Sequence, residues 1–424
     1  ELAADKGYVD LHEAIADGRR LEAGDKVYAS IAGKTLILAR IGKRSPVDGL
    51  RVVGGHTDAP RIDLKPRPLY EDGGVALLDS HYYGGIKKYQ WVTIPLALHG
   101  KVIKADGGHV DICIGEDPDD PVLTITDILP HLGKKQSQKK MAEAITGEGL
   151  DVLVGSIPEK GEDKDNGAGA VKKNVLRILN DRYDLCEEDL ISAELQLVPA
   201  GPARHLGIDE SMVIGYGHDD RVCAYAAMRA MMDARATPEY TSVCIMCDKE
   251  EIGSTGSTGM ESYVFENTIA ELVNLCIDDY SDLAVRRCLR NSAMISADVN
   301  TLHDPLYADV SSPHGNMATI NHGVVLTKYS GSRGKAHAND ANAEYVGRIR
   351  RIFNDAKVAW QSAELGKVDE GGGGTIAYMM ARYEMDVIDC GTGLFCMHAP
   401  YEVAGKYDIY MTYKAYAAFY ADKG

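Results

Sequence analysis

The sequence lacks the long apolar run and the basic surface that two large classes of protein require. Nowhere in its 424 residues does an uninterrupted apolar segment approach the roughly 18 residues of a membrane-spanning helix, so a membrane protein is not expected. Acidic residues outnumber basic ones, and the formal net charge is −17. Because nucleic-acid binding needs a basic surface, a nucleic-acid partner is not expected either.

The sequence also lacks the cysteine pattern of a disulfide-stabilised protein and, at its start, the pattern of a signal peptide. The nine cysteines are odd in number, and several, such as Cys113 and Cys244, lie inside apolar runs, as reduced and packed thiols do. Residues 1–10 mix charged and small side chains without a basic segment followed by an apolar one. These absences together predict a cytoplasmic protein.

What is present is the composition of a large globular protein. The apolar fraction is 45% and the charged fraction is 26%, which are ordinary values. A chain of 424 residues is longer than one hydrophobic core normally supports, so we expect two domains. Short β-rich runs broken by Gly and Pro predict an inserted β-rich domain at 61–202. Residues 1–60 and 203–424 would together form the other domain.

Outside the insertion, apolar runs of strand length alternate with helical patterns. Such alternation predicts an α/β domain with a mixed, mainly parallel sheet sandwiched by helices. The runs 35–39 and 50–54, separated by a turn-forming stretch, are expected to pair as a hairpin. The expected strands after residue 211 are 213–216, 242–247, 293–298 and 386–389, and the main expected helices are 221–234, 341–356, 375–382 and 408–420.

Acidic and histidine side chains follow the expected strands at the point where each strand ends. Because the carboxyl ends of parallel strands meet at one edge of a sheet, we expect these side chains to gather in one strongly anionic cleft. The side chains concerned are those of His56, Asp58, Asp219, Asp220, Glu250, Glu251, Asp298 and His398.

Several carboxylates in one cleft need compensating positive charge, since like charges a few ångströms apart raise one another's pKa. Two divalent ions would supply it, and imidazole with carboxylate donors suits zinc, with manganese or cobalt as further candidates. Each residue alone has a plainer interpretation: Asp219 as a helix cap, and Glu250 with Glu251 as a solvated turn. Their joint occurrence at successive strand ends favours a dinuclear metal site.

The two adjacent glutamates have complementary roles in such a site. One carboxylate can bind a metal ion while its neighbour takes a proton from the attacking water and passes it to a leaving amine. Chemistry alone leaves open which of Glu250 and Glu251 is the ligand and which is the base. Asp58, two residues after His56, is placed to accept the other ring N–H of that histidine or to cap a turn.

Five segments of the chain, taken in order, resemble the aspartyl aminopeptidase and aminopeptidase I family of metallopeptidases. The resemblance extends over nearly the whole chain, and the combination of segments is specific although each is short. The segments are Gly54-Gly55-His56-Thr57-Asp58-Ala59-Pro60, Gly217-His218-Asp219-Asp220-Arg221, Asp248-Lys249-Glu250-Glu251-Ile252-Gly253-Ser254, Ser296-Ala297-Asp298 and Met397-His398.

The resemblance implies a zinc-peptidase fold and a role for each residue of the site. It also implies that the inserted β-rich domain serves subunit association, in a tetrahedral dodecamer with enclosed active sites. The implied roles are Glu250 as general base, Asp219 as the ligand shared by two metal ions, His56 with Asp298 as ligands of one ion, and Glu251 with His398 as ligands of the other.

A lysine of the sequence also matches a family position near the bound substrate. Lys328 ends the β-rich run 324–328, and it is either a substrate-binding residue or a surface lysine at a strand end. If it binds the substrate side chain, Asp or Glu would be favoured as the N-terminal residue. The glycine-rich stretch 371–374 likewise matches a turn that adjoins the substrate site in the family.

The sequence departs from the family pattern at two places. Many relatives have Leu-Asp-Asn where this chain has His218-Asp219-Asp220, so Asp220 is a rival ligand to Asp219. Relatives often carry two histidines in the inserted domain, whereas here His131 supplies one and Lys135 stands in place of the second. A contribution from a neighbouring subunit therefore stays open, as does a preference for acidic substrates.

The predicted function is removal of the N-terminal residue from peptides by a homo-oligomeric, metal-dependent aminopeptidase. A dinuclear deacylase of N-acyl amino acids would use the same ligands, because metal ligation does not reveal whether the substrate has a free amine. A non-catalytic assembly protein that retains the fold is a third hypothesis, from which the intact set of ligands and Glu250 distinguish the enzyme.

Overall fold

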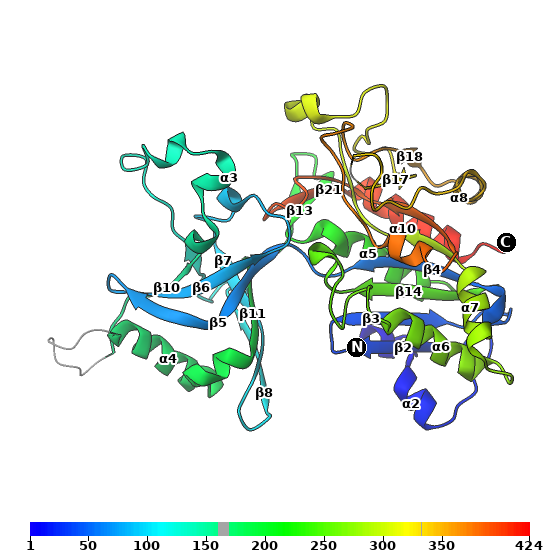
Figure 1. The fold of residues 1–424 in the computed structure, drawn as a ribbon, viewed down its shortest axis with the longest axis horizontal. Coiled ribbons are helices and arrows are strands. Elements are labelled where there is room, and N and C mark those ends of the chain that lie inside the picture. Colours follow the sequence, from blue (N-terminus) through cyan, green and yellow to red (C-terminus); the bar gives the residue numbers. More distant parts are fainter. Residues whose placement is uncertain (160–168, 332) are drawn as a thin grey trace. The chain divides into compact units, whose positions relative to one another are not determined.

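The computed structural model describes residues 1–159, 169–331 and 333–424, which form a mixed α/β structure (Figure 1). By its contacts the chain divides into two compact units. The first unit comprises Glu1–Ala59, His205–Met397 and Glu402–Gly424, and the second comprises Pro60–Arg204 and His398–Tyr401. Among the described residues, no helix is both long enough and apolar enough to cross a membrane.

The first unit is built on a mixed sheet whose central strands are parallel. β14, β4, β15 and β19 run side by side in the same direction, while β3 and β17 flank them in the antiparallel direction. In spatial order the strands are β1 (Val9–Asp10), β2 (Lys26–Ile31), β3 (Thr35–Arg40), β14 (Thr241–Cys247), β4 (Leu50–His56), β15 (Ala293–Ser296), β19 (Asp386–Gly391), β17 (Val324–Thr327) and β18 (Trp360–Ser362).

The expected hairpin of runs 35–39 and 50–54 is wrong. Both runs are strands, β3 and β4, but β14 lies between them and pairs with each. The strand that pairs with β3 in a hairpin is β2. β4 is buried along its whole length, which suits a central parallel strand better than the edge of a local hairpin.

Helices cover both faces of this sheet because its strands are apolar on both sides. Val53 packs with α5, α8 and α10 on one face, and Val52 packs with α2, α6, α7 and α9 on the other. Cys244 and Cys247, three residues apart in β14, lie on opposite faces, because successive side chains of a strand alternate. The helices are α1 (Leu2–Asp5), α2 (Leu11–Ala16), α5 (His218–Met232), α6 (Val264–Cys276), α7 (Asp282–Arg290), α8 (Ala343–Asp355), α9 (Ala377–Ala381) and α10 (Lys406–Tyr420).

The expected strand 213–216 does not belong to the main sheet. It forms β13, which pairs in the antiparallel direction with β21 in a smaller sheet. The first sheet therefore does not present Asp219 at the end of one of its own strands, because Asp219 lies at the start of α5. The smaller sheet contains, in spatial order, β12 (Arg204–Leu206), β13 (Met212–Gly215), β21 (Glu402–Gly405), β20 (Gly393–Phe395) and β16 (Asn300–Thr301).

The second unit is an antiparallel sheet with its own apolar core. Ile62, Trp91 and Leu197 are fully buried in it. Its helices are α3 (Met141–Ala144) and α4 (Ala170–Tyr183). Its strands, in spatial order, are β8 (His109–Ile114), β7 (Leu96–Ile103), β11 (Ala193–Pro199), β5 (Arg61–Asp72), β6 (Val75–Tyr83), β10 (Val152–Gly155) and β9 (Thr124–Ile125).

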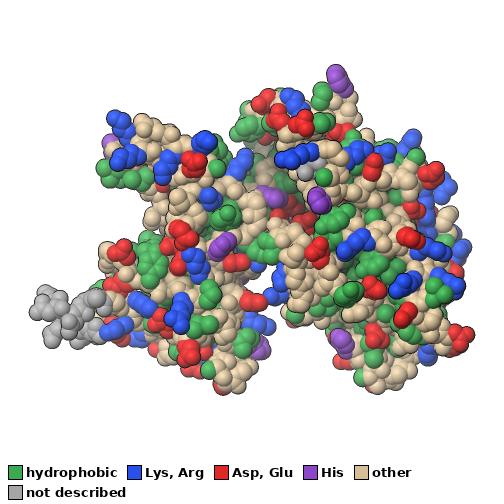
Figure 2. All heavy atoms as spheres, viewed as in Figure 1, with side chains coloured by type: hydrophobic (Ala, Val, Ile, Leu, Met, Phe, Trp, Pro, Cys, Tyr) green, Lys and Arg blue, Asp and Glu red, His purple; other side chains and the backbone are tan. Residues whose placement is uncertain are grey.

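Charged side chains of both signs lie on the surface. On the face drawn in Figure 2, Lys and Arg side chains are interspersed with Asp and Glu side chains. This mixed pattern differs from the continuous basic stripe that a nucleic-acid-binding face presents.

Candidate metal centre

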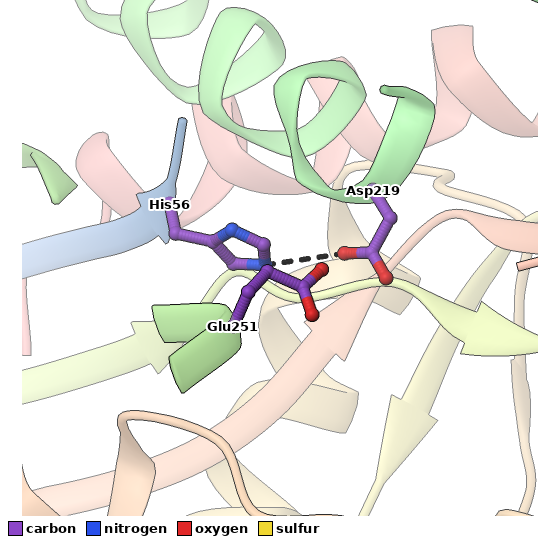
Figure 3. A group of neighbouring side chains, drawn as sticks. All are labelled: His56, Asp219 and Glu251. Atoms are coloured by element: carbon purple, nitrogen blue, oxygen red, sulfur yellow. Dashed lines mark ion pairs between the residues drawn. The ribbon is translucent and has the colours of Figure 1, made fainter. Parts of the chain in front are cut away.

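His56 ends β4 at the carboxyl edge of the parallel strands. Its ring Nδ1 lies 2.9 Å from the main-chain oxygen of Asp58, so this nitrogen carries the proton and Nε2 is left to accept or to bind a cation. Nε2 lies 3.1 Å from Oδ1 of Asp219 (Figure 3). The sequence predicted the Asp58 carboxylate as the partner of Nδ1, but its oxygen is farther away, at 3.4 Å.

The strand reaches the site because it has a glycine before the histidine. A Cβ atom on Gly55 would lie 2.3 Å from Oδ2 of Asp220 and 2.6 Å from the main-chain oxygen of Ala297. Only glycine lets the two neighbouring segments approach this closely. The main-chain N–H of His56 then donates to Oδ2 of Asp220 at 3.2 Å.

Asp219 and Asp220 come from the first turn of α5, and both are buried. The peptide bond between them is cis. The N–H of Asp219 donates to Oε2 of Glu402 at 3.0 Å, which fixes the main chain from the β21 side. Glu402 is only 1% exposed, and the sequence analysis did not single it out.

Glu250 and Glu251 lie in the short 3₁₀ helix Glu250–Ile252 that follows β14. The Asp58 carboxylate accepts the N–H of Glu250 at 3.1 Å and that of Glu251 at 3.2 Å. Asp58 therefore holds this turn as well as the ring of His56. Oε2 of Glu250 lies 3.9 Å from Nε2 of His56, so the two adjacent glutamates both reach the site.

Within the part of the chain that the structure describes, two groups of side chains could each hold a metal ion. The first contains His56, Asp219 and Glu251, which converge from three different elements (Figure 3). The second contains Asp219, Asp220 and Asp298. The ligand atoms of each group lie within 4.8 Å of one another, and Asp219 belongs to both.

The donor set fits divalent ions of the zinc type. One imidazole nitrogen and several carboxylate oxygens converge in a partly enclosed place, and this mixture of donors suits zinc. Asp220 is a further candidate ligand, because it belongs to the second group together with Asp219.

The electrostatics of the cluster show the same need for positive charge. Burial raises the pKa of Asp298 well above its usual value, and the charges of Asp220 and Asp219 raise it further. Burial also raises the pKa of Asp220, with Asp219 adding to the effect. Burial alone would lower the pKa of His56, but hydrogen bonds to Asp219 and Asp58 outweigh it and raise the pKa. A cation bound in the cluster would offset the repulsion between these carboxylates and lower their pKa values.

His398 and Lys328 belong to neither of the two groups found among the described residues. His398 lies in the segment His398–Tyr401 of the second unit, where its Nδ1 is 2.8 Å from the main-chain oxygen of Gly85. Because Nδ1 faces a carbonyl oxygen, it carries the ring proton, as in His56. Lys328 directly follows β17, is exposed, and has its Nζ 3.9 Å from Oδ1 of Asp340.

A second carboxylate that sequence reasoning missed is that of Asp389. It was included in an expected strand, and its burial at the same sheet edge became visible only from the register of β15, β19 and β17. A polar residue near the end of an apolar strand run was the available signal.

An α/β sheet edge that brings an imidazole and several carboxylates within bonding reach of a divalent ion is the site of a metal-dependent hydrolase. The family model described as "Aminopeptidase I zinc metalloprotease (M18)" matches residues 1–420. The chain belongs to this family and is a metal-dependent aminopeptidase.

The relatives match over almost their whole length. A protein of Clostridium acetobutylicum named "Probable M18 family aminopeptidase 1" is 52% identical over 420 residues, which cover 99% of this chain and 89% of the relative. A crystal structure of an M18 aminopeptidase from Thermotoga maritima has a TM-score of 0.93 at 43% identity and covers 99% of this chain and 90% of its own. A structure described as the S. cerevisiae mApe1 dodecamer shares the fold, with a TM-score of 0.78 at 21% identity, over 99% of this chain and 90% of its own.

Proposed function

We propose that the aminopeptidase uses two divalent ions, most simply zinc, held by His56, Asp219, Glu251, Asp298 and His398. The observation that supports a pair of ions is that Asp219 belongs to both ligand groups, which is what a bridging carboxylate requires. His398 enters the proposal through the family resemblance, and the contact of its Nδ1 with the main-chain oxygen of Gly85 orients the ring. Manganese and cobalt are the alternatives to zinc.

In the proposed mechanism Glu250 is the general base. Bound divalent ions would supply the Lewis acidity that polarises a carbonyl group and lowers the pKa of water. Glu250, 3.9 Å from the ring nitrogen of His56, accepts a proton from the attacking water and returns it to the amine that leaves. Asp58 accepts the main-chain N–H groups of Glu250 and Glu251, and so fixes the positions of the base and the ligand relative to each other.

The proposed substrates are peptides with a free N-terminal amine, with Asp or Glu as the candidate first residue. Lys328 is the side chain proposed to meet the substrate, because it is exposed at the end of β17 and its partner Asp340 is 3.9 Å away, a distance that a substrate carboxylate can compete with.

We further propose that the chain works as a homo-oligomer in the cytoplasm, with the second unit as the association domain. The yeast structure described as a dodecamer supports a closed assembly, and a tetrahedral dodecamer is the form we propose. Exposed apolar side chains between residues 128 and 141 of the second unit offer a surface for association.

The experiment that tests the proposed reaction separates it from deacylation. The protein is stripped with a chelator, reloaded with zinc, manganese or cobalt in turn, and assayed on aminoacyl anilides with Asp, Glu, Leu and Ala. Each substrate is supplied both with a free amine and as its N-acetyl derivative. We expect hydrolysis of the free-amine series only; cleavage of the acetylated series at a similar rate would contradict the proposal and indicate a deacylase.

A further inference from the structure

A buried carboxylate outside the candidate ligands, that of Asp389, lies at the same sheet edge. Asp389 is near the end of β19 and is 4% exposed. The register places it beside Ser296 of β15 and Thr327 of β17. Ser296 comes shortly before Asp298, and Thr327 directly before Lys328. Asp389 therefore lies between the strand that leads to the metal site and the strand that leads to the proposed substrate lysine.

The Asp389 carboxylate accepts hydrogen bonds from two loops that are distant in the sequence. Thr375 Oγ1 donates to its Oδ1 at 2.7 Å, and Ser330 Oγ donates to its Oδ2 at a longer 3.5 Å. Thr375 follows the glycine-rich stretch 371–374, and Ser330 follows Lys328 closely. One side chain thus fastens both loops to β19.

The two loops are also joined to each other. The N–H of Gly331 donates to the main-chain oxygen of Gly373 at 2.5 Å, and the N–H of Ala341 closes the base of the first loop by donating to the main-chain oxygen of Lys328 at 2.9 Å. Residues of both loops line a small cavity of about 50 Å³. The position of Lys328 therefore depends on the hydrogen bonds that hold the two loops.

Hydroxyl groups rather than charges surround Asp389. Burial raises the pKa of its carboxyl group to about 6, although the neighbouring hydroxyl groups of Ser296, Thr375 and Ser330 lower it. On its own strand the other titratable side chains are those of Asp386 and Cys390. Burial raises the pKa of the Cys390 thiol above its usual value, and the charge of Asp389 adds to the effect. Protonation of Asp389 would replace a charged acceptor with a neutral acid, whose hydrogen bonds to the two loops are weaker.

We propose that Asp389 is a positioning residue for substrate binding: its ionised carboxylate holds the loop that carries Lys328 and the glycine-rich loop at the sheet edge. The inference rests on the proposed function, because it takes these loops as part of the substrate site. Its consequence is that substrate affinity, rather than turnover, depends on the ionisation of Asp389. Affinity therefore falls as the pH falls through about 6.

The first test compares Asp389→Asn with the unchanged enzyme across pH. The variant is neutral at every pH, so its KM should exceed that of the unchanged enzyme by about 10-fold near pH 8, with kcat altered by less than about 3-fold. Below about pH 5 the unchanged enzyme is neutral at this position too, and the ratio of the two KM values should approach one. The ratio cancels the titration of groups that both proteins share.

The second test removes the donor instead of the acceptor. Thr375→Val keeps the size of the side chain without its hydroxyl, and it should raise KM in the same way as Asp389→Asn. Thr375→Ser keeps the hydroxyl and should leave KM within about 2-fold of the unchanged value. This matched pair keeps the proposal testable even where Asp389→Asn folds poorly.

A readout without catalysis is available in the first loop. Arg333 and Lys335 are exposed trypsin sites. If the loop loosens, trypsin should cleave at these two residues faster in both Asp389→Asn and Thr375→Val than in the unchanged enzyme near pH 8. Asp408→Asn is the control, because Asp408 is a buried carboxylate that accepts the N–H groups of Asn321 and Gly323, which precede β17 at the end opposite to Lys328. It should not change trypsin cleavage at these sites.

Two outcomes would overturn the positioning role. One is a KM of Asp389→Asn and of Thr375→Val equal to that of the unchanged enzyme. The other is a KM ratio that stays constant between about pH 5 and pH 8, since this would show that ionisation of Asp389 is irrelevant. A protein that binds zinc but hydrolyses no peptide would contradict the proposed function, and the trypsin comparison would still decide the role of Asp389.

Discussion

At the residue scale, Gly55 packs directly against two segments that carry candidate ligands. A Cβ there would meet a carboxylate oxygen of Asp220 at 2.3 Å and a main-chain oxygen of Ala297 at 2.6 Å. We predict that Gly55→Ala lowers both the thermal midpoint and the zinc content, because Asp220 and the segment leading to Asp298 must move apart. The loss of unfolding free energy should reach about 3 kcal/mol, the upper end for overpacking. Calorimetry and elemental analysis of the purified variant measure the two effects.

The adjacent glycine provides the matched control. A Cβ on Gly54 would meet the flexible end of Met294 at 3.0 Å and Ile245 at 3.3 Å, away from any ligand. Gly54→Ala should therefore cost about 1 kcal/mol of stability and leave the zinc content unchanged. Equal zinc loss in the two variants would show that Gly55 has no special relation to the ligands.

Several candidate ligands were singled out from the sequence because they follow apolar strand runs and match family segments, and the structure brings His56, Asp219, Glu251 and Asp298 together in two groups. The roles of Glu402 and Asp389 were not predicted: the place of Asp389 near the end of an apolar run was a signal, but the local sequence does not show which distant N–H or hydroxyl either carboxylate accepts. The relation of Asp58 to its neighbours was predicted only in part. Its position two residues after His56 indicated the contact with the ring, but its hydrogen bonds to Glu250 and Glu251 depend on β14 lying beside β4.

At the element scale, the turn after β14 depends on one acceptor from the neighbouring strand end. The Asp58 carboxylate accepts two N–H groups of this turn. An amide can accept through only one of its two terminal atoms, so Asp58→Asn leaves one N–H without its partner. We predict a loss of zinc affinity of about 10- to 100-fold, as for other groups that orient metal ligands. Competition with a chromophoric chelator measures it.

The control for this prediction makes the same chemical change in the same turn. The Asp248 carboxylate accepts the hydroxyl of Thr258 at 2.7 Å and contributes a similar negative charge nearby. Asp248→Asn should lower zinc affinity by less than about 3-fold. A loss as large as that of Asp58→Asn would mean that charge, and not the hold on the turn, explains the effect.

The burial of Asp389 in β19 has a consequence for stability as well as for binding. Its pKa in the folded protein is about 6, above the usual 3.8. The stability that this carboxyl group contributes is therefore present below about pH 4 and lost as the pH rises through 6. The difference of about two pH units corresponds to about 3 kcal/mol.

We accordingly predict that the unfolding free energy of the unchanged protein, relative to that of Asp389→Asn, falls by up to about 3 kcal/mol between pH 4 and pH 7. Urea unfolding of both proteins at several pH values measures this difference. A difference that is flat with pH, or that rises with it, would show that the carboxyl group is not destabilised by burial.

The elements themselves were largely predictable, whereas their pairing was not. The helix 408–420 and the strand 242–247 agree closely with α10 and β14 because periodicity and buried apolar runs are local signals. The hairpin of runs 35–39 and 50–54 failed because β14, nearly two hundred residues later, takes the place between them. The assignment of 213–216 to the main sheet failed for the same reason, since β21 pairs with it from the far end of the chain.

At the scale of the whole molecule, the proposed assembly predicts an apolar surface that is exposed in the single chain and becomes buried when subunits associate. Leu129 and Leu132 of the second unit are 50% and 68% exposed. Replacing both with Asp should dissociate the oligomer, because charges at an association surface lose their hydration when it closes. Light scattering coupled to size exclusion measures the mass.

Ile208→Asp serves as the control for this prediction, since Ile208 is fully exposed in the first unit. It should leave the mass unchanged. An unchanged mass in the double variant as well would place the association surface elsewhere.

The central claim, a metal-dependent aminopeptidase in which Glu250 is the base and Glu251 a ligand, is tested most directly by measuring zinc content and turnover together in Glu250→Gln and Glu251→Gln. We predict that Glu250→Gln keeps the zinc content of the unchanged protein while kcat falls by about 10²- to 10⁴-fold, and that Glu251→Gln loses zinc as well as turnover. Turnover that persists in Glu250→Gln, or zinc loss in that variant with full retention in Glu251→Gln, would contradict it.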